Sequence, residues 1–145
     1  MLSDAPSTAT LAGDGGWEER SRLTTLQDNV LLNGERAATV SVEALRWGDA
    51  AHISALAARW PAGFQTIVAS DVLYSPRMYD ALAATIHALA AADAAVIFSY
   101  PERHGDELTF VERLSPAFER ISRDADASES HANELRIIEL RRQRR

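Results

Sequence analysis

The chain has 145 residues, of which 46% are hydrophobic and 25% charged, as is typical of one soluble globular domain. Its formal net charge of −6 argues against an extensive nucleic-acid-binding surface, and all 15 basic residues are arginine. The absence of cysteine excludes disulfides, thiolate metal sites and a cysteine nucleophile. No apolar run approaches the roughly 20 residues that span a bilayer, so we expect no membrane contact and a cytoplasmic protein, with the nucleus as the alternative.

The N-terminal part of the chain is rich in Ser, Thr, Ala and Gly and has no hydrophobic period, which predicts a flexible leader over residues 1–19. Residues 20–145 are then expected to form one domain. Leucine and valine recur at helical spacing over 20–33, so a helix is predicted there. Gly34 follows it as a helix stop that tolerates positive φ.

Three predicted strands alternate with helices in the middle of the chain. Residues 38–45 alternate as in a half-buried strand, whereas 64–69 and 94–99 are short apolar runs expected for strands covered on both faces. Asp49 is a candidate N-cap for the first intervening helix, and Ser75-Pro76 is a cap-plus-first-turn pair for the second.

The C-terminal third predicts a helix followed by two strands. Asp106 is a candidate N-cap, and residues 119–122 and 134–140 read as strands joined by the polar stretch 124–133, which suggests an antiparallel hairpin. The alternation of strands and helices predicts an α/β fold with a largely parallel sheet.

Two polar clusters follow predicted strands, where ligands bind in open α/β sheets. In the cluster after residues 38–45, Trp47 could pack against an aromatic ligand ring, Gly48 would permit close approach, and Asp49 could accept hydrogen bonds. The structural alternative is a core tryptophan beside an ordinary helix N-cap.

The second cluster follows the strand predicted at 64–69. Asp71 and Tyr74 could together orient and desolvate an amine or hold a charged cofactor, and the alternative is a turn-forming Asp with a half-buried Tyr. A metal site is not expected, because the four histidines are scattered along the chain: His52, His87, His104 and His131.

Over about residues 22–122 the chain resembles the seven-strand S-adenosylmethionine-dependent methyltransferases of the protein-lysine type. Those proteins carry an N-V-x-x-N helix, an L-x-W-G segment, an acidic-x-x-Tyr motif and a Y-x-x-R segment in that order. The matching residues here are Asn29-Val30-Leu31-Leu32-Asn33, Leu45-Arg46-Trp47-Gly48-Asp49, Asp71-Val72-Leu73-Tyr74 and Tyr100 with Arg103, then Glu107 and Phe110 in the helix that follows.

The resemblance implies a Rossmann-like methyltransferase sheet with helices on both faces and a C-terminal antiparallel hairpin. Its cofactor would be S-adenosylmethionine, with Trp47 against the adenine and Gly48, Asp49 and Asp71 also in the cofactor site. Asp71 and Tyr74 would lie near the methyl donor and the incoming lysine amine of a protein substrate. The implied chemistry is in-line transfer of a methyl group to a neutral amine.

The chain departs from the family pattern at its N-terminus. Family members begin with a strand and an E-x-G-x-G-x-x-G loop, and their second strand ends in an acid for the ribose. The one glycine cluster here, at 13–16, follows no strand-like run, and Leu23-Thr24-Thr25 offers no acid. We therefore expect the N-terminal strands to be missing and the chain to correspond to the C-terminal two-thirds of a methyltransferase.

Missing strands would have a structural consequence. In the family's sheet order, 3-2-1-4-5-7-6, the first strand lies beside the one matched by residues 64–69, so its absence would expose an apolar sheet edge. Homo- or hetero-association could use that edge. A non-catalytic remnant that binds a protein partner is therefore the alternative function. A third hypothesis, nucleic-acid binding by the arginines at 141–145, is opposed by the net charge.

Overall fold

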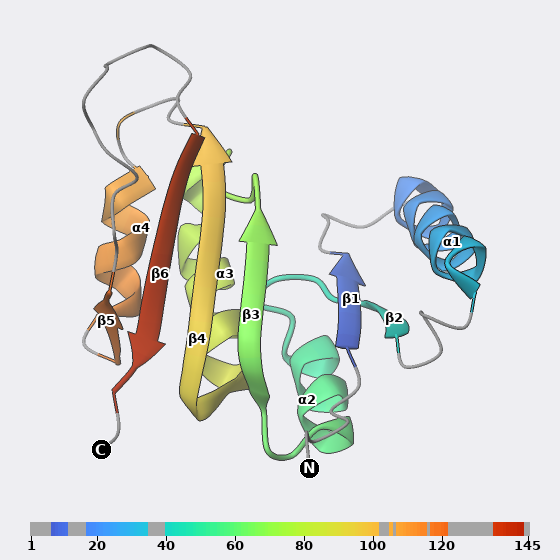
Figure 1. Cartoon of the computed structure of the whole chain (residues 1–145), viewed down its shortest axis with the longest axis horizontal. Helices are drawn as coiled ribbons and strands as arrows, with labels where there is room; N and C mark the ends of the chain where they lie inside the picture. The colour runs from blue at the N-terminus through green and yellow to red at the C-terminus, as the bar shows by residue number, and fades with distance from the viewer. Residues whose placement is uncertain are drawn as a thin grey trace.

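The computed structural model describes residues 7–11, 17–34, 40–101, 105, 107–115, 117–121 and 135–143, which form an α/β fold (Figure 1). None of the described helices combines the length and hydropathy of a membrane span. In chain order the elements are β1 (Ser7–Leu11), α1 (Trp17–Leu32), β2 (Val40–Ala44), α2 (Ala50–Arg59), β3 (Phe64–Ser70), the 3-10 turn η2 (Pro76–Met78), α3 (Tyr79–Leu89), β4 (Ala90–Pro101), α4 (Glu107–Leu114), β5 (Phe118–Arg120) and β6 (Leu135–Arg142).

The strands form two hydrogen-bonded groups. β1 and β2 make a parallel pair, and β3, β4, β6 and β5 make a four-stranded sheet in that order. Within the larger sheet β3 and β4 are parallel, whereas β6 is antiparallel to both β4 and β5. This arrangement confirms the α/β class and the C-terminal antiparallel strands. In Figure 1, β1 lies on the side of β2 that faces β3.

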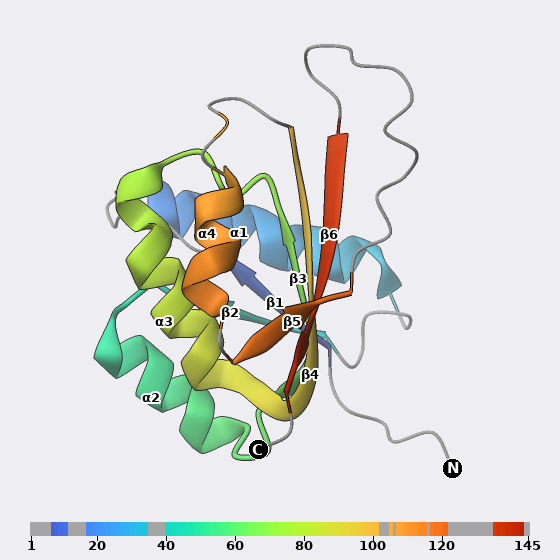
Figure 2. The same ribbon diagram turned by 90° about the vertical axis from the view of Figure 1, so that its left-hand side faces the viewer.

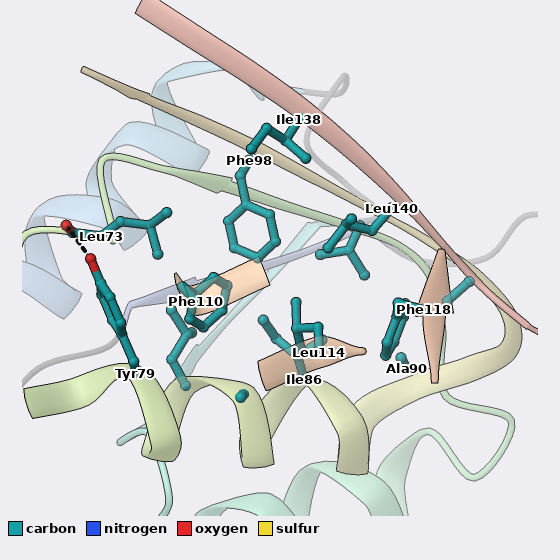
Figure 3. Close-up of a cluster of buried hydrophobic side chains, with 14 of the residues drawn as sticks. Leu73, Tyr79, Ile86, Ala90, Phe98, Phe110, Leu114, Phe118, Ile138 and Leu140 are labelled. Carbon is teal, nitrogen blue, oxygen red and sulfur yellow. Dashed lines mark hydrogen bonds between the residues drawn. The ribbon is translucent and has the colours of Figure 1, made fainter. Parts of the chain in front are cut away.

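The core lies between the four-stranded sheet and helices α3 and α4, which cover the same face of it (Figure 2). Alternate residues of β4 point into this core, as expected for a strand, and Val96 and Phe98 are almost fully buried. Phe110 of α4 packs edge-on against Phe98, with ring centroids 5.1 Å apart (Figure 3). Burying aromatic rings of this size supplies much of the hydrophobic stabilisation.

The opposite face of the sheet is partly open. Val68 of β3 is 70% exposed and Ile137 of β6 is 53% exposed, while Ile97 of β4, paired with Val68, is half-buried. The expectation that residues 64–69 are covered on both faces is therefore wrong. Only the face that carries Ile67 and Ala69 packs against the core, and an apolar run alone could not distinguish one covered face from two.

Part of the segment predicted as a leader is regular structure. β1 and the first residues of α1 fall within residues 1–19, and β1 pairs along its whole length with β2. The strand escaped prediction because Ser-Thr-Ala-Thr-Leu has no clear alternation, and its pairing depends on a partner distant in sequence. β1 occupies the place that the family order gives to the second strand. None of the described residues forms the strand that is numbered 1 in that order.

The glycine cluster at 13–16 lies outside the described residues, but its neighbours correct one expectation. A strand does precede it, because β1 ends at Leu11, and α1 follows from Trp17. Leu23-Thr24-Thr25 lies inside α1 and not at a strand end. The first acidic residue after β1 in the sequence is Asp14, which also lies outside the described residues.

Helix boundaries agree with the sequence signals in part. Gly34 has φ of +57° just after α1, as predicted. Asp49 is the N-cap of α2, but the side chain of Ser75 makes no capping hydrogen bond, and η2 intervenes before α3 begins. The predicted cap of α4, Asp106, lies outside the described residues.

Helix α3 passes directly into β4, since it ends at Leu89 and β4 begins at Ala90. The guanidinium of Arg142, near the end of β6, donates a hydrogen bond to the carbonyl of Ala90. Arg141 and Arg142 thus lie at the end of a paired strand. The junction between α3 and β4 is thus held by a side chain from the neighbouring strand β6.

Candidate functional site

Two loops at the carboxyl ends of parallel strands bring the predicted aromatic residues together. Trp47 follows β2 and Tyr74 follows β3, and their ring centroids lie 6.4 Å apart with the planes tilted by 40°. Trp47 is half-buried against the core, whereas Tyr74 is 52% exposed. The pair therefore offers a firmly held ring beside an accessible one.

The Trp47 loop is held against α3 through its backbone. The N–H of Gly48 donates to the hydroxyl oxygen of Thr85 at 2.8 Å. Gly48 has φ of +75°, and a Cβ there would lie 3.0 Å from the Cβ of Ala81. Glycine is required at this position both for its backbone conformation and for the close approach of α3.

The same loop is held by α2 on its other side. The N–H of Arg46 donates to Nδ1 of His52 at 3.0 Å, which requires that nitrogen to be unprotonated. His52, expected to be merely scattered, thus has a structural role. Among the described residues no group of three or more His, Asp or Glu side chains is placed to hold a metal.

Asp49 supports this loop as a helix cap. Its Oδ1 accepts hydrogen bonds from the N–H groups of Ala51 and His52, at 2.9 and 3.1 Å. The bond from the His52 N–H is the main reason that the pKa of Asp49 lies below its ordinary value. Burial is the next-largest influence and raises this pKa, whereas the positive charge of nearby side chains and the Ala51 bond lower it. These contacts are those of the N-cap alternative, and a cofactor role for Asp49 stays a prediction.

Asp71 has an unusual backbone. Its φ is +54°, and among the described residues no other non-glycine residue has a positive φ. The side chain is exposed, and the N–H donates to the carbonyl of Ser99 on β4 at 2.7 Å, which fixes the residue at the end of β3. Left-handed backbone at a non-glycine residue costs free energy and is found more often at functional positions.

The loop from Asp71 to Tyr74 is also fixed by α3. Leu73 is only 3% exposed, and its carbonyl accepts a hydrogen bond of 3.2 Å from the hydroxyl of Tyr79 (Figure 3). Tyr79 is itself buried and packs edge-on against Phe110 at 5.3 Å. A buried leucine between two candidate site residues thus leaves Asp71 and Tyr74 outside the core.

The described part of the last resembling segment is buried. Tyr100, Glu107 and Phe110 are buried at 4%, 2% and 0% exposure, in β4 and α4, and Arg103 lies outside the described residues. Two residues that hold the site loops, Thr85 and Tyr79, were not found from the sequence. Both lie in the helix predicted after Ser75-Pro76, but their hydrogen-bond partners lie in loops that only the fold brings close.

The order β3-β4-β6-β5, with β6 antiparallel to both of its neighbours, is that of the C-terminal part of a Rossmann-like methyltransferase sheet. The chain belongs to the lysine methyltransferase family, whose sequence profile matches residues 18–117. A search of the curated proteins finds no match.

Two similar solved structures are bacterial methyltransferases. The N-methyltransferase NodS from Bradyrhizobium japonicum WM9, in complex with S-adenosyl-L-homocysteine, is 15% identical, with 89% of each chain covered and a TM-score of 0.47. The 1,6-didemethyltoxoflavin-N1-methyltransferase from Burkholderia thailandensis, with bound 1,6-didemethyltoxoflavin and S-adenosylhomocysteine, is 14% identical. There the match covers 94% of this chain and 72% of that chain, with a TM-score of 0.45.

The described residues fit part of an S-adenosylmethionine molecule. A half-buried indole beside an exposed phenol suits the flat adenine ring, because such rings stack or pack edge-on at this separation. An exposed carboxylate, that of Asp71, suits the positively charged sulfonium end or a cationic amine.

Proposed function

We propose that this chain transfers a methyl group from S-adenosylmethionine to a side-chain amine of a protein, with lysine as the acceptor. The observation that carries the proposal is the convergence of Trp47 and Tyr74 from two separate loops in a chain of the lysine methyltransferase family. The positive φ of Asp71 adds support, because a strained backbone conformation at the end of β3 is more often found at functional positions.

The residues would divide the work as follows. Trp47 would hold the adenine, with Gly48 and Asp49 beside it. The cofactor supplies an electrophilic methyl group on its sulfonium. Asp71 would attract the protonated amine and help it to lose its proton, since only the neutral amine has a lone pair to react. Tyr74 would line the path of that amine.

The accessible position of Tyr74 suits a macromolecular substrate. A phenol with half of its surface open to solvent can contact the aliphatic stem of a lysine that enters from outside. The substrate is thus proposed to be a protein whose lysine reaches the site from solvent at a surface loop and is not enclosed in a cavity.

Cofactor binding tests the first half of this proposal. Calorimetric titration with S-adenosylhomocysteine should show micromolar binding, and Trp47→Ala should weaken it at least tenfold. Trp60→Ala serves as the control, because Trp60 packs against Phe64 in a separate cluster with α2. Equal affinity of the Trp47 variant and the wild-type chain would refute the assigned role.

Turnover tests the second half. Transfer of labelled methyl to lysine-containing proteins should be lost in Asp71→Asn and reduced in Tyr74→Phe, while both variants keep their affinity for S-adenosylhomocysteine within a few-fold. Labelling that survives in Asp71→Asn would show that this carboxylate does not assist the amine.

A second candidate function is favoured by one observation, the free edge of β3. In the described part of the chain β3 pairs with β4 alone, and its Val68 side chain is 70% exposed. We propose as the alternative a protein-binding module in which an extended segment of a partner, or of another copy, adds to this edge. Light scattering should then show association that Val68→Asp abolishes, without cofactor affinity. A monomer that binds S-adenosylhomocysteine would exclude this alternative.

A further inference from the structure

Trp47 is flanked by two backbone amides, and each is bound by a side chain from a different helix. The preceding one, of Arg46, donates to His52 of the adjacent α2, a local contact. The following one, of Gly48, donates to Thr85 of α3, which is far along the sequence. The first bond therefore joins the Trp47 loop to the helix that directly follows it, whereas the second joins the loop to α3, a distant helix.

The Thr85 hydroxyl is set up as an acceptor. Its own proton is donated to the carbonyl of Ala81 at 2.8 Å, one turn earlier in α3, so an oxygen lone pair is left for the Gly48 N–H. The side chain is only 3% exposed, so water does not compete for this lone pair. Ala81 also closes the space beside Gly48, which leaves the loop little room to slide along the helix.

Helix α3 serves both halves of the site. Tyr79 in its first turn holds the Leu73 carbonyl, and Thr85 further along holds Gly48. The same helix thus holds both of the loops that carry Trp47 and Tyr74, whose rings lie 6.4 Å apart.

We infer that Thr85 is a positioning residue that holds Trp47 in place for the cofactor. The inference rests on the proposed function, since it assigns Thr85 to the same site. It acts through the Gly48 amide and not by touching the ligand. A side chain at 85 that keeps shape but cannot accept a hydrogen bond would free the indole to move.

The test uses Trp47 as its own reporter. In a Trp17→Phe, Trp60→Phe background it is the remaining tryptophan of the chain, so fluorescence reports its surroundings without any ligand. Thr85→Val should shift the emission and raise iodide quenching about twofold, and lower the affinity for S-adenosylhomocysteine roughly fivefold to tenfold, as loss of one hydrogen bond predicts. Thr85→Ser should match the parent within about twofold in both measurements.

Two controls keep the outcome clear. If Thr85→Val does not unfold cooperatively, Thr85→Cys replaces it, because a thiol of similar size is a weak acceptor and should give the same changes at smaller amplitude. A folded Val or Cys variant with unchanged emission and quenching would overturn the inference. A parent chain that fails to bind S-adenosylhomocysteine would refute the proposed function, and the ligand-free fluorescence would then still decide whether Thr85 positions Trp47.

Discussion

The hydroxyl of Tyr79 donates a hydrogen bond of 3.2 Å to the carbonyl of Leu73, which joins helix α3 to the loop between Asp71 and Tyr74. We expect Tyr79→Phe to lower the free energy of unfolding by about 1 kcal/mol, because a buried carbonyl loses its donor while the ring contacts remain. Urea unfolding would measure the change.

The same variant should also reduce the affinity for S-adenosylhomocysteine, since the loop that carries Tyr74 is loosened. Tyr79→Leu is the comparison, because it removes the ring that packs against Phe110 as well and should cost more stability. Unchanged stability and affinity in Tyr79→Phe would show that this bond does not hold the loop.

The left-handed backbone of Asp71 predicts a conflict between stability and activity. Asp71→Gly should leave the chain as stable as the wild type or more stable by up to about 1 kcal/mol, since glycine adopts positive φ without strain. Asp71→Ala should be less stable than Asp71→Gly by roughly 1 kcal/mol. Both should lose methyl transfer. Thermal unfolding and a labelling assay on the same preparations would show the separation, and active Asp71→Gly would contradict it.

The capping role of Asp49 predicts a dependence on pH. Because the pKa of this carboxyl is lower in the folded chain than in the unfolded chain, the stability it contributes is present above its unfolded pKa and is lost as the pH falls through the folded pKa. The loss should therefore occur below about pH 4. Asp49→Asn and Asp49→Ser keep a capping oxygen without a titrating group.

These two variants should show a shallower fall in melting temperature between about pH 7 and about pH 3 than the wild-type chain. Asp49→Ala, which has no capping oxygen, should have a lower melting temperature at every pH. Parallel curves for the wild type and Asp49→Asn would mean that other carboxyls account for the acid sensitivity.

Alanine substitutions at Gly48 and Gly34 can separate the cost of a strained backbone conformation from the cost of a steric clash. Both have positive φ, +75° and +57°, but a Cβ on Gly48 would lie 3.0 Å from Ala81 whereas one on Gly34 would meet nothing within 4 Å. Gly34→Ala should cost about 1 kcal/mol of stability from conformation alone. Gly48→Ala should cost roughly 1–2 kcal/mol more, because α3 and the loop must move apart.

Cofactor affinity should follow the same division. Gly48→Ala should weaken binding of S-adenosylhomocysteine by displacing Trp47, while Gly34→Ala, after α1, should leave it unchanged. Calorimetry on both variants would test this, and equal affinities would argue that the loop adapts without moving the indole.

Local patterns predicted most of the fold from β2 onward. The cap at Asp49 and the hairpin of β5 and β6 depend on neighbouring residues, and the structure confirms both. The strand predicted at 38–45 is confirmed as β2 over Val40–Ala44, but its residues are all partly buried and do not alternate. β1 was missed because its stability comes from pairing with a distant strand and not from its own residues.

Candidate site residues were predictable in position but not in their surroundings. Spacing placed Trp47 and Tyr74 after two strands that are consecutive in the prediction, and the structure brings their rings together. The positive φ of Asp71 and the bonds from Thr85 and Tyr79 depend on tertiary contacts, which no local pattern encodes. Residue roles toward cofactor and substrate stay predictions.

Because α3 passes into β4 without a loop, the C-terminal strand β6 can stabilise the candidate site through this junction. Arg142 on β6 bonds to Ala90, the first residue after α3, and so anchors the end of that helix opposite to Tyr79. In native-state hydrogen exchange, the Gly48 amide should therefore open together with amides of β4 and β6 and not with those of the surface loops.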